Sequence, residues 1–195
     1  MNPLRFWILT ALIVLAAASR LAPHPDNVAP VSALALFGAA TYRGRLAATL
    51  VPLGALLLSD VLLQLTYQTG WQPRVGFYPG QWVVYACLGA TVLLGFLLRR
   101  RRTVATVALA TLASSTLFFL ATNFVWFYGS GSLYPRTAAG LLACYGAALP
   151  FFRNSLAGDF FYSALLFGTF ALAEWRFPAL RWPAVPRGCE ILVAR

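Results

Sequence analysis

The sequence has little charge, and its positive charge is of one kind. Only 10% of its 195 residues are charged, and all fifteen basic residues are arginine, so lysine is absent. An average soluble domain has about 25% charged residues. Hydrophobic residues make up 60% of the chain, and the mean hydropathy is +0.72. This composition excludes an ordinary soluble domain and predicts an integral membrane protein.

Cysteines and the motifs typical of catalytic or metal-binding sites are also scarce. The three cysteines, Cys87, Cys144 and Cys189, are widely spaced and form no CxxC pair, which excludes a typical zinc site and implies no disulfide framework. The chain has no HExxH, no serine nucleophile motif and no phosphate-binding loop. The net charge of +10 comes in short clusters between apolar runs, which argues against nucleic-acid binding.

Six apolar stretches predict membrane-spanning helices, which need about 20 apolar residues each. They cover residues 4–21, 29–42, 45–66, 80–98, 103–127 and 151–175, and the second is short. Residues 136–149 are too short to span and end at Pro150, so we expect a separate helix at the membrane interface there. The predicted fold is all-α, a single polytopic domain with a tail at 177–195.

The distribution of arginine predicts how the chain is oriented. Eleven arginines, including Arg99–Arg102 in "LLRRRRTV", fall on one side of the six spans, and four fall on the other. The side richer in arginine is usually cytoplasmic. Both termini are therefore expected in the cytoplasm, and the side with Arg20, Arg74, Arg136 and Arg153 is expected to face outward.

A signal peptide is the alternative interpretation of the first 20 residues. Arg5, an apolar core and "AAAS" are typical of one. The apolar run continues almost to Arg20 and is followed by a polar loop, which favours a membrane span.

With this topology, the polar residues of the spans converge on the outer side. An ionisable side chain in hydrocarbon costs roughly 2.5–3.5 kcal/mol on insertion scales, so such residues usually face a bundle interior or a cavity. We expect an outward-facing polar cavity that captures a solute. Its candidate residues are His24, Asp60, Tyr78, Tyr85, Cys87, Asn123, Arg153 and Asp159. Two alternatives stay open: Asp60 and Asp159 pair with Arg153 only to hold helices together, and His24 is a solvated loop residue.

Four stretches resemble the BtuM family of small bacterial membrane proteins, over roughly residues 23–173. They are "PHPDNVAPVSALALFGAA", "LVPLGALLLSDVLL", "TNFVWF" and "YPRTAAGLLACYGAALPFFRNSLAGDFFYSALLFG". This family consists of solitary relatives of the substrate-binding S-components of ECF vitamin transporters. The resemblance implies a six-helix S-component-like bundle in the bacterial inner membrane. It also implies uptake of vitamin B12 (cobalamin) from the outer side without a dedicated ATPase module.

The resemblance also implies roles for the candidate residues. The phosphate of cobalamin suits Arg153, and the amides of the corrin rim suit Asp60, Asn123 and Tyr85. The family is associated with a cysteine whose sulfur reaches the cobalt and helps to remove cyanide from cyanocobalamin. Cys87 is the candidate for this contact, with Cys144 as a weaker one.

Two other functions remain open. The first is a membrane enzyme that modifies the upper ligand of the corrinoid, with Cys87 as its nucleophile. The second is an S-component-like subunit for another small solute that needs a separate energising partner. The small residues of Ala35-x-x-x-Ala39 would let such a partner pack closely.

The predicted orientation is tested by cysteine-accessibility labelling of intact cells. An impermeant reagent should reach a cysteine placed at Ser130 and miss one placed at Arg101, because the arginine cluster is expected in the cytoplasm. The reverse labelling pattern would contradict both the orientation and the outward-facing cavity.

Overall fold

The computed structural model describes residues 2–129 and 132–181, and every regular element in these ranges is a helix. The prediction of an all-α fold is confirmed for this part of the chain. The elements are α1 (Pro3–Ala18), η1 (Ser19–Leu21), α2 (Val31–Thr41), α3 (Arg45–Gln68), α4 (Trp82–Leu97), α5 (Val104–Tyr128), α6 (Ala138–Arg176) and η2 (Pro178–Leu180).

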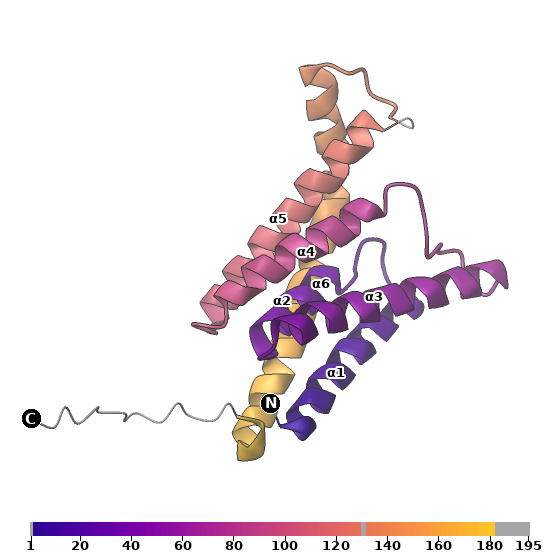
Figure 1. Cartoon of the computed structure of the whole chain (residues 1–195). Helices are drawn as coiled ribbons and strands as arrows, with labels where there is room; N and C mark the ends of the chain where they lie inside the picture. The colour runs from indigo at the N-terminus through magenta and orange to yellow at the C-terminus, as the bar shows by residue number, and fades with distance from the viewer. Residues whose placement is uncertain (1, 130–131, 182–195) are drawn as a thin grey trace, which may run out of the picture.

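Helix α2 lies in the centre, and the other five α-helices surround it (Figure 1). Each of them contacts α2, and contacts also run around the ring from α1 to α3, α4, α5, α6 and back to α1. Every residue of α2 except Val31 is buried. The helix is apolar on all sides because protein, rather than water, surrounds it.

Among residues 2–129 and 132–181, four helical segments are long and apolar enough to cross a membrane: α1 with η1, α3, α5 and α6. The other two are shorter, with 11 residues in α2 and 16 in α4. At 1.5 Å per residue α2 is about 16 Å long, roughly half of a bilayer core. The predicted span at 29–42 is therefore a short buried helix, and the count of six spans stays a prediction.

The separate interfacial helix predicted before the last span is wrong. Residues 138–176 form one helix of 39 residues, and Pro150 lies inside it. Packing against α5 on both sides of the proline offsets the lost hydrogen bond: the Phe119 ring lies 5.5 Å from Tyr145 and 4.5 Å from Phe152. The Tyr145 hydroxyl also donates to the Leu120 carbonyl at 2.8 Å. The end of α5 and the start of α6 thus form a hairpin that projects beyond the other helices (Figure 1).

An aspartate from α6 accepts hydrogen bonds from the backbone N–H groups at the amino-terminal end of α2. The Asp159 carboxylate accepts hydrogen bonds from the backbone N–H groups of Ser32 and Ala33 and from the Ser32 hydroxyl. The Ser115 hydroxyl of α5 donates to it at 2.6 Å. The first N–H groups of a helix have no partner within the helix, and the helix dipole favours an anion there. Asp159 therefore joins α2, α5 and α6.

Arginines donate hydrogen bonds to the backbone carbonyls at the carboxyl-terminal end of α2. Arg99 Nε donates to the Ala39 carbonyl and its Nη2 to the Tyr42 carbonyl, each at 2.7 Å. Arg5 Nη2 donates to the Thr41 carbonyl at 3.3 Å. The last carbonyls of a helix also lack partners and favour a cation. Both ends of the buried helix are thus capped by charges of the appropriate sign.

Small residues bring α2 into direct contact with its neighbours. A Cβ placed on Gly95 of α4 would lie 2.5 Å from the Ala39 Cβ, and one on Gly38 would overlap the Pro52 ring of α3. Ala35 and Ala39 are both fully buried. The surface predicted to receive an energising partner is therefore covered by the protein itself.

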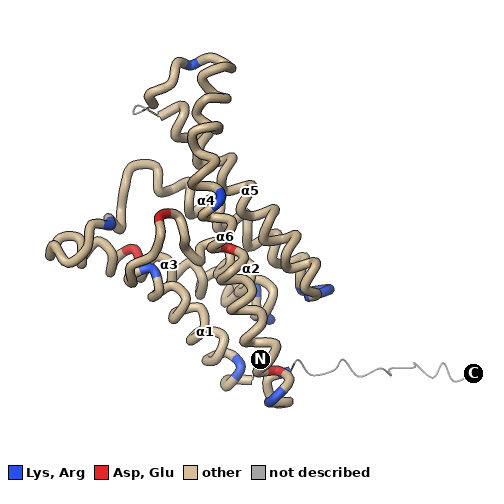
Figure 2. Tube along the Cα trace, turned by 180° about the vertical axis from the view of Figure 1, so that it is seen from behind, with Lys and Arg blue, Asp and Glu red and all other residues tan. Residues whose placement is uncertain are grey.

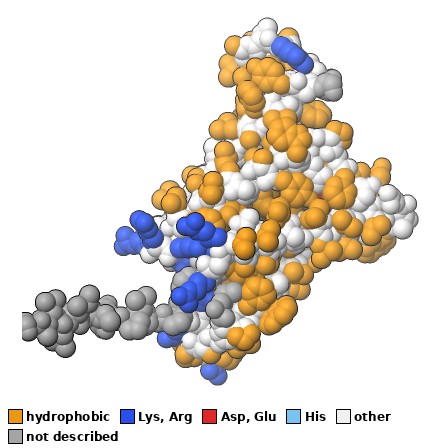
Figure 3. Space-filling model, in the orientation of Figure 1, with side chains coloured by type: hydrophobic (Ala, Val, Ile, Leu, Met, Phe, Trp, Pro, Cys, Tyr) orange, Lys and Arg blue, Asp and Glu red, His pale blue; other side chains and the backbone are white. Residues whose placement is uncertain are grey.

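Most arginines lie at the end of the bundle that holds the amino terminus, the start of α5 and the end of α6 (Figures 2 and 3). We call this the arginine-rich end; it contains Arg5, Arg43, Arg45, Arg99, Arg100, Arg101, Arg102, Arg176 and Arg181. The rest of the face in Figure 3 is largely apolar.

Arg5, which we counted as a marker of topology, also has a structural role. It is 4% exposed, pairs with Glu174 at 2.6 Å and lies 4.8 Å from the Phe170 ring centroid. It also donates to the Leu180 carbonyl of η2, which holds the start of the predicted tail against α1. The remainder of that tail, with Cys189, lies outside the described residues.

Replacing Asp159 with Ala should destabilise the protein. The change leaves N–H groups of α2 without a partner, and each such buried group costs about 1–3 kcal/mol. We expect the unfolding midpoint in detergent to fall by several degrees, and Asp159→Asn, which keeps an acceptor, to fall less. Arg153→Ala, at an exposed position of the same helix, is the matched control. Equal midpoints for Asp159→Ala and the control would contradict the capping role.

Candidate functional site

A cavity of about 410 Å³ lies at the end of the bundle opposite the arginine-rich end. We call it the loop cavity, because the loops at 22–30 and 69–81 contribute most of its wall. Its lining residues are Arg20, His24, Asp26, Asn27, Ala29, Leu63, Arg74, Val75 and Phe151. Arginine, carboxylate, amide and imidazole groups therefore meet in one hollow. The volume is within the usual range for small-molecule sites, roughly 300–1,000 Å³.

Arg74 joins the two loops that form the cavity. Its Nη1 donates to the Ala22 carbonyl at 3.1 Å and its Nη2 to the His24 carbonyl at 2.5 Å. A guanidinium has five N–H donors. Arg74 therefore positions the loops and still has donors for a ligand. His24 also lines the cavity, and its Nδ1 lies 2.9 Å from the Pro25 carbonyl oxygen.

The loop at 22–30 rests directly on α6. The Asn154 amide donates to the Asp26 carbonyl at 3.2 Å. A Cβ on Gly158 would lie 3.1 Å from the Val28 Cα, so a larger residue here would require the loop to shift by a few tenths of an ångström. Asn27 has a φ of 63°, a left-handed conformation that asparagine tolerates better than most residues. These contacts hold Asn27 in the cavity wall.

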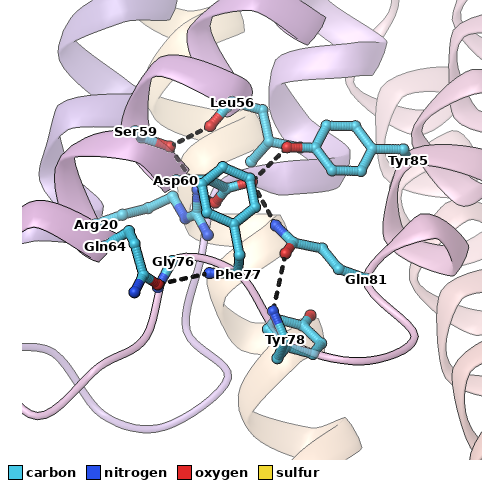
Figure 4. A network of polar contacts seen from close by, with 10 residues as sticks. All are labelled: Arg20, Leu56, Ser59, Asp60, Gln64, Gly76, Phe77, Tyr78, Gln81 and Tyr85. Atoms are coloured by element: carbon cyan, nitrogen blue, oxygen red, sulfur yellow. Dashed lines mark hydrogen bonds and ion pairs between the residues drawn. The ribbon is translucent and has the colours of Figure 1, made fainter. Parts of the chain in front are cut away.

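Behind the cavity, Asp60 organises a buried polar network (Figure 4). Its Oδ1 pairs with Arg20 Nη1 at 2.6 Å. Its Oδ2 accepts from Gln81 Nε2 at 2.7 Å and from the Tyr85 hydroxyl at 2.6 Å. Asp60 is 1% exposed. Of the two roles left open by the sequence, the structure places Asp60 and Tyr85 in internal support, and the arginine partner is Arg20 rather than Arg153.

The same network holds the loop at 69–81 against α3. The Gly76 N–H donates to Gln64 Oε1 at 3.2 Å, and a Cβ at Gly76 would overlap the Asp60 carbonyl oxygen. The Tyr78 N–H donates to Gln81 Oε1 at 3.2 Å. Burial raises the pKa of the Tyr78 phenol, and the nearby Asp60 charge raises it further. Tyr78 thus stays protonated and can donate a hydrogen bond at the edge of the loop.

The structure does not bring Arg153 into the cavity lining. Arg153 is exposed on α6, whereas Phe151 lines the cavity and Asn154 contacts the loop. At about 100° per residue, Arg153 is turned roughly 200° from Phe151. It therefore lies on a different face of the helix from the residues that meet the loops.

Two other candidates also lie outside the lining. The Asn123 amide donates to the Phe119 carbonyl of its own helix at 2.8 Å. Asp159 caps α2 and is 4% exposed. Of the eight candidates, only His24 is among the lining residues, and Tyr78 lies in the loop at 69–81 without lining the cavity.

The candidate cysteines are buried and separate from the loop cavity. Cys87 is 5% exposed and Cys144 is 3% exposed. Cys87 and Tyr85 are two positions apart on α4, so their side chains leave the helix about 200° apart. Since Tyr85 points to the Asp60 network, Cys87 points away from it. Among residues 2–129 and 132–181, no three His, Cys, Asp or Glu side chains cluster as metal ligands would.

Sequence reasoning missed Arg20, Arg74 and Gln81 as site residues. Arg20 and Arg74 were used only to assign topology. The available signal was their position: both are among the few arginines on the sparsely charged side. Gln81 had no distinguishing pattern, since its role depends on Asp60 of another helix.

Comparison with known families assigns the chain to a group. Residues 2–180 match the family described as a family of unknown function, DUF6580. The chain belongs to this family. Neither the curated proteins nor the solved structures contain a match.

Replacing Asp60 with Ala should loosen the loop at 69–81. Arg20 loses its counter-ion, Gln81 and Tyr85 lose their acceptor, and breaking a buried pair costs about 3–5 kcal/mol. Arg74 is the only trypsin site in this loop. We expect cleavage after Arg74 to accelerate at least about tenfold, as followed by mass spectrometry of the fragments.

Asp26→Ala is the control for this prediction. Asp26 is exposed, and the hydrogen bond that holds its loop uses its backbone carbonyl. Cleavage after Arg74 should therefore stay near the wild-type rate. Unchanged cleavage in Asp60→Ala would contradict the network's role.

Proposed function

We propose that the protein takes up vitamin B12 (cobalamin) across the bacterial inner membrane, capturing it from the outer side at the loop cavity. The observation that carries the proposal is a polar cavity at the end of the bundle opposite the arginine-rich end. In this proposal the arginine-rich end faces the cytoplasm, by the positive-inside rule, and the cavity faces outward. The identity of the solute rests on the resemblance to the BtuM family, which also implies that no dedicated ATPase module is required.

The cavity offers groups that suit a zwitterionic, amide-rich solute. Arg74 provides donors for a phosphate, and Asp26 and Asn27 provide partners for amide groups. Arg20 is largely neutralised by Asp60, which leaves Arg74 as the better anion-binding group. In this proposal Arg74, rather than Arg153, receives the phosphate of cobalamin.

Only part of cobalamin fits the loop cavity, because the whole molecule is larger than 410 Å³. The nucleotide end would enter, and the apolar corrin face would lie against Phe151 and Val75 at the wall. In the space-filling view, the outline is hollowed between the projecting α5–α6 hairpin and the far end of α3 (Figures 1 and 3). This hollow leaves room for the remainder of the ligand.

Absorption spectroscopy of the protein, purified from cells grown with cobalamin, tests the ligand class. A corrin band should accompany the wild-type protein. Arg74→Ala should weaken binding roughly tenfold or more, because hydrogen bonds to charged groups contribute about 1.5–3 kcal/mol. Arg153→Ala should bind as the wild type does.

Thermal stability separates binding from folding in this experiment, since Arg74 also joins two loops. A folded Arg74→Ala protein with weakened binding supports the proposal. The absence of a corrin band in the wild type would contradict it. Loss of binding in Arg153→Ala alone would instead place the phosphate-binding group on α6, as the resemblance implies.

Removal of cyanide from bound cyanocobalamin by Cys87 can be tested separately from binding. The Cys87 thiol is buried on a face of α4 turned away from Tyr85, and it does not line the loop cavity. We therefore expect bound cyanocobalamin to keep its cyanide, and Cys87→Ser to leave the spectrum unchanged. A shifted band that Cys87→Ser abolishes would favour the enzyme instead, because thiolate is a far better soft-metal ligand than a hydroxyl.

A further inference from the structure

A second cavity, of about 440 Å³, opens between α5 and α6 near the arginine-rich end. The Thr111 hydroxyl donates to Ser163 at 3.0 Å at its closed end, and beyond this contact the two helices diverge (Figure 1). We call it the α5–α6 groove. Its lining residues are Arg102, Thr103, Val104, Val107, Ala108, Thr111, Phe160, Ser163, Ala164, Phe167, Gly168, Phe170, Ala171 and Glu174.

Small residues on α6 make the groove deep. Ala164, Gly168 and Ala171 follow one another along one side of the helix. A Cβ added at Gly168 would meet no atom within 4 Å, so the space beside it is open. The wall is almost entirely apolar along this length, which suits a hydrocarbon chain.

The mouth of the groove carries positive charge. Arg102 lies there 3.8 Å from Glu174, whose closer partner is Arg5 at 2.6 Å. Arg102, Glu174 and the Arg5 bound to it together carry a net charge of +1, and the exposed Arg100 and Arg101 directly precede Arg102 in the sequence. An anionic group therefore complements this end of the groove.

We propose that the α5–α6 groove binds an anionic phospholipid, with one acyl chain along Gly168 and the headgroup phosphate at Arg102. A phosphate is strongly attracted to arginines at a membrane surface, and the groove runs from that surface into the apolar part of the bundle. This site lies on different residues from the loop cavity, so the proposal does not depend on cobalamin.

Native mass spectrometry of the full chain, released from detergent after incubation with phosphatidylglycerol or phosphatidylcholine, tests the proposal. The wild type should retain one phosphatidylglycerol and less phosphatidylcholine. Gly168→Leu should lose this lipid because leucine fills the groove. Gly146→Leu is the matched control, since Gly146 is also on α6 with no atom within 4 Å of an added Cβ and does not line the groove.

Charge variants test the headgroup contact. Arg102→Gln should reduce the preference for phosphatidylglycerol about fivefold, the factor expected for one basic residue near a membrane surface. Arg101→Gln, in the same segment but outside the lining, should change it less. Equal lipid retention by wild type and Gly168→Leu would overturn the proposal. So would a wild-type dimer that Gly168→Leu dissociates, because a second copy would then fill the groove.

Discussion

The structure depends on burying a helix that is too short to cross a membrane. A buried helix end leaves N–H and C=O groups without water, and each unsatisfied group is costly in apolar surroundings. Asp159 meets this requirement at the start of α2, and Arg99 meets it at the end. Asp159 comes from α6, and Arg99 comes from the segment directly after α4. These two charges therefore also fix the positions of the surrounding helices relative to α2.

This use of charge determines where a ligand can bind. Asp159 and Asp60 are committed to internal contacts, so neither is available to a solute without disrupting the fold. The polar groups that line the loop cavity come mainly from the loops, above all Arg74 and His24. The helices supply the support, and the loops supply the groups that the proposed binding would use, as is common where a rigid scaffold carries a site.

Apolar runs were sufficient to predict α1 to α5, and of the predicted polar residues Asp60 and Tyr85 meet in one network. The partners of those residues could not be predicted, because they depend on which side chains meet across helices. Asp60 meets Arg20 instead of Arg153 for this reason. Pro150 misled the prediction in a similar way: a local signal favours a break, but packing between Phe119 and Phe152 keeps α6 continuous.

The loop cavity and the centre of the bundle are joined over a short stretch of chain. Gly158 receives the loop at Val28, and the next residue, Asp159, caps the helix that begins at Val31. Ala29, between these contacts, lines the cavity. Because α2 contacts all five surrounding helices, the cavity wall at Ala29 is connected through α2 to the whole described ring of helices. Under the proposed function, capture of a solute would therefore act on the segment that enters α2, the helix around which the bundle is arranged.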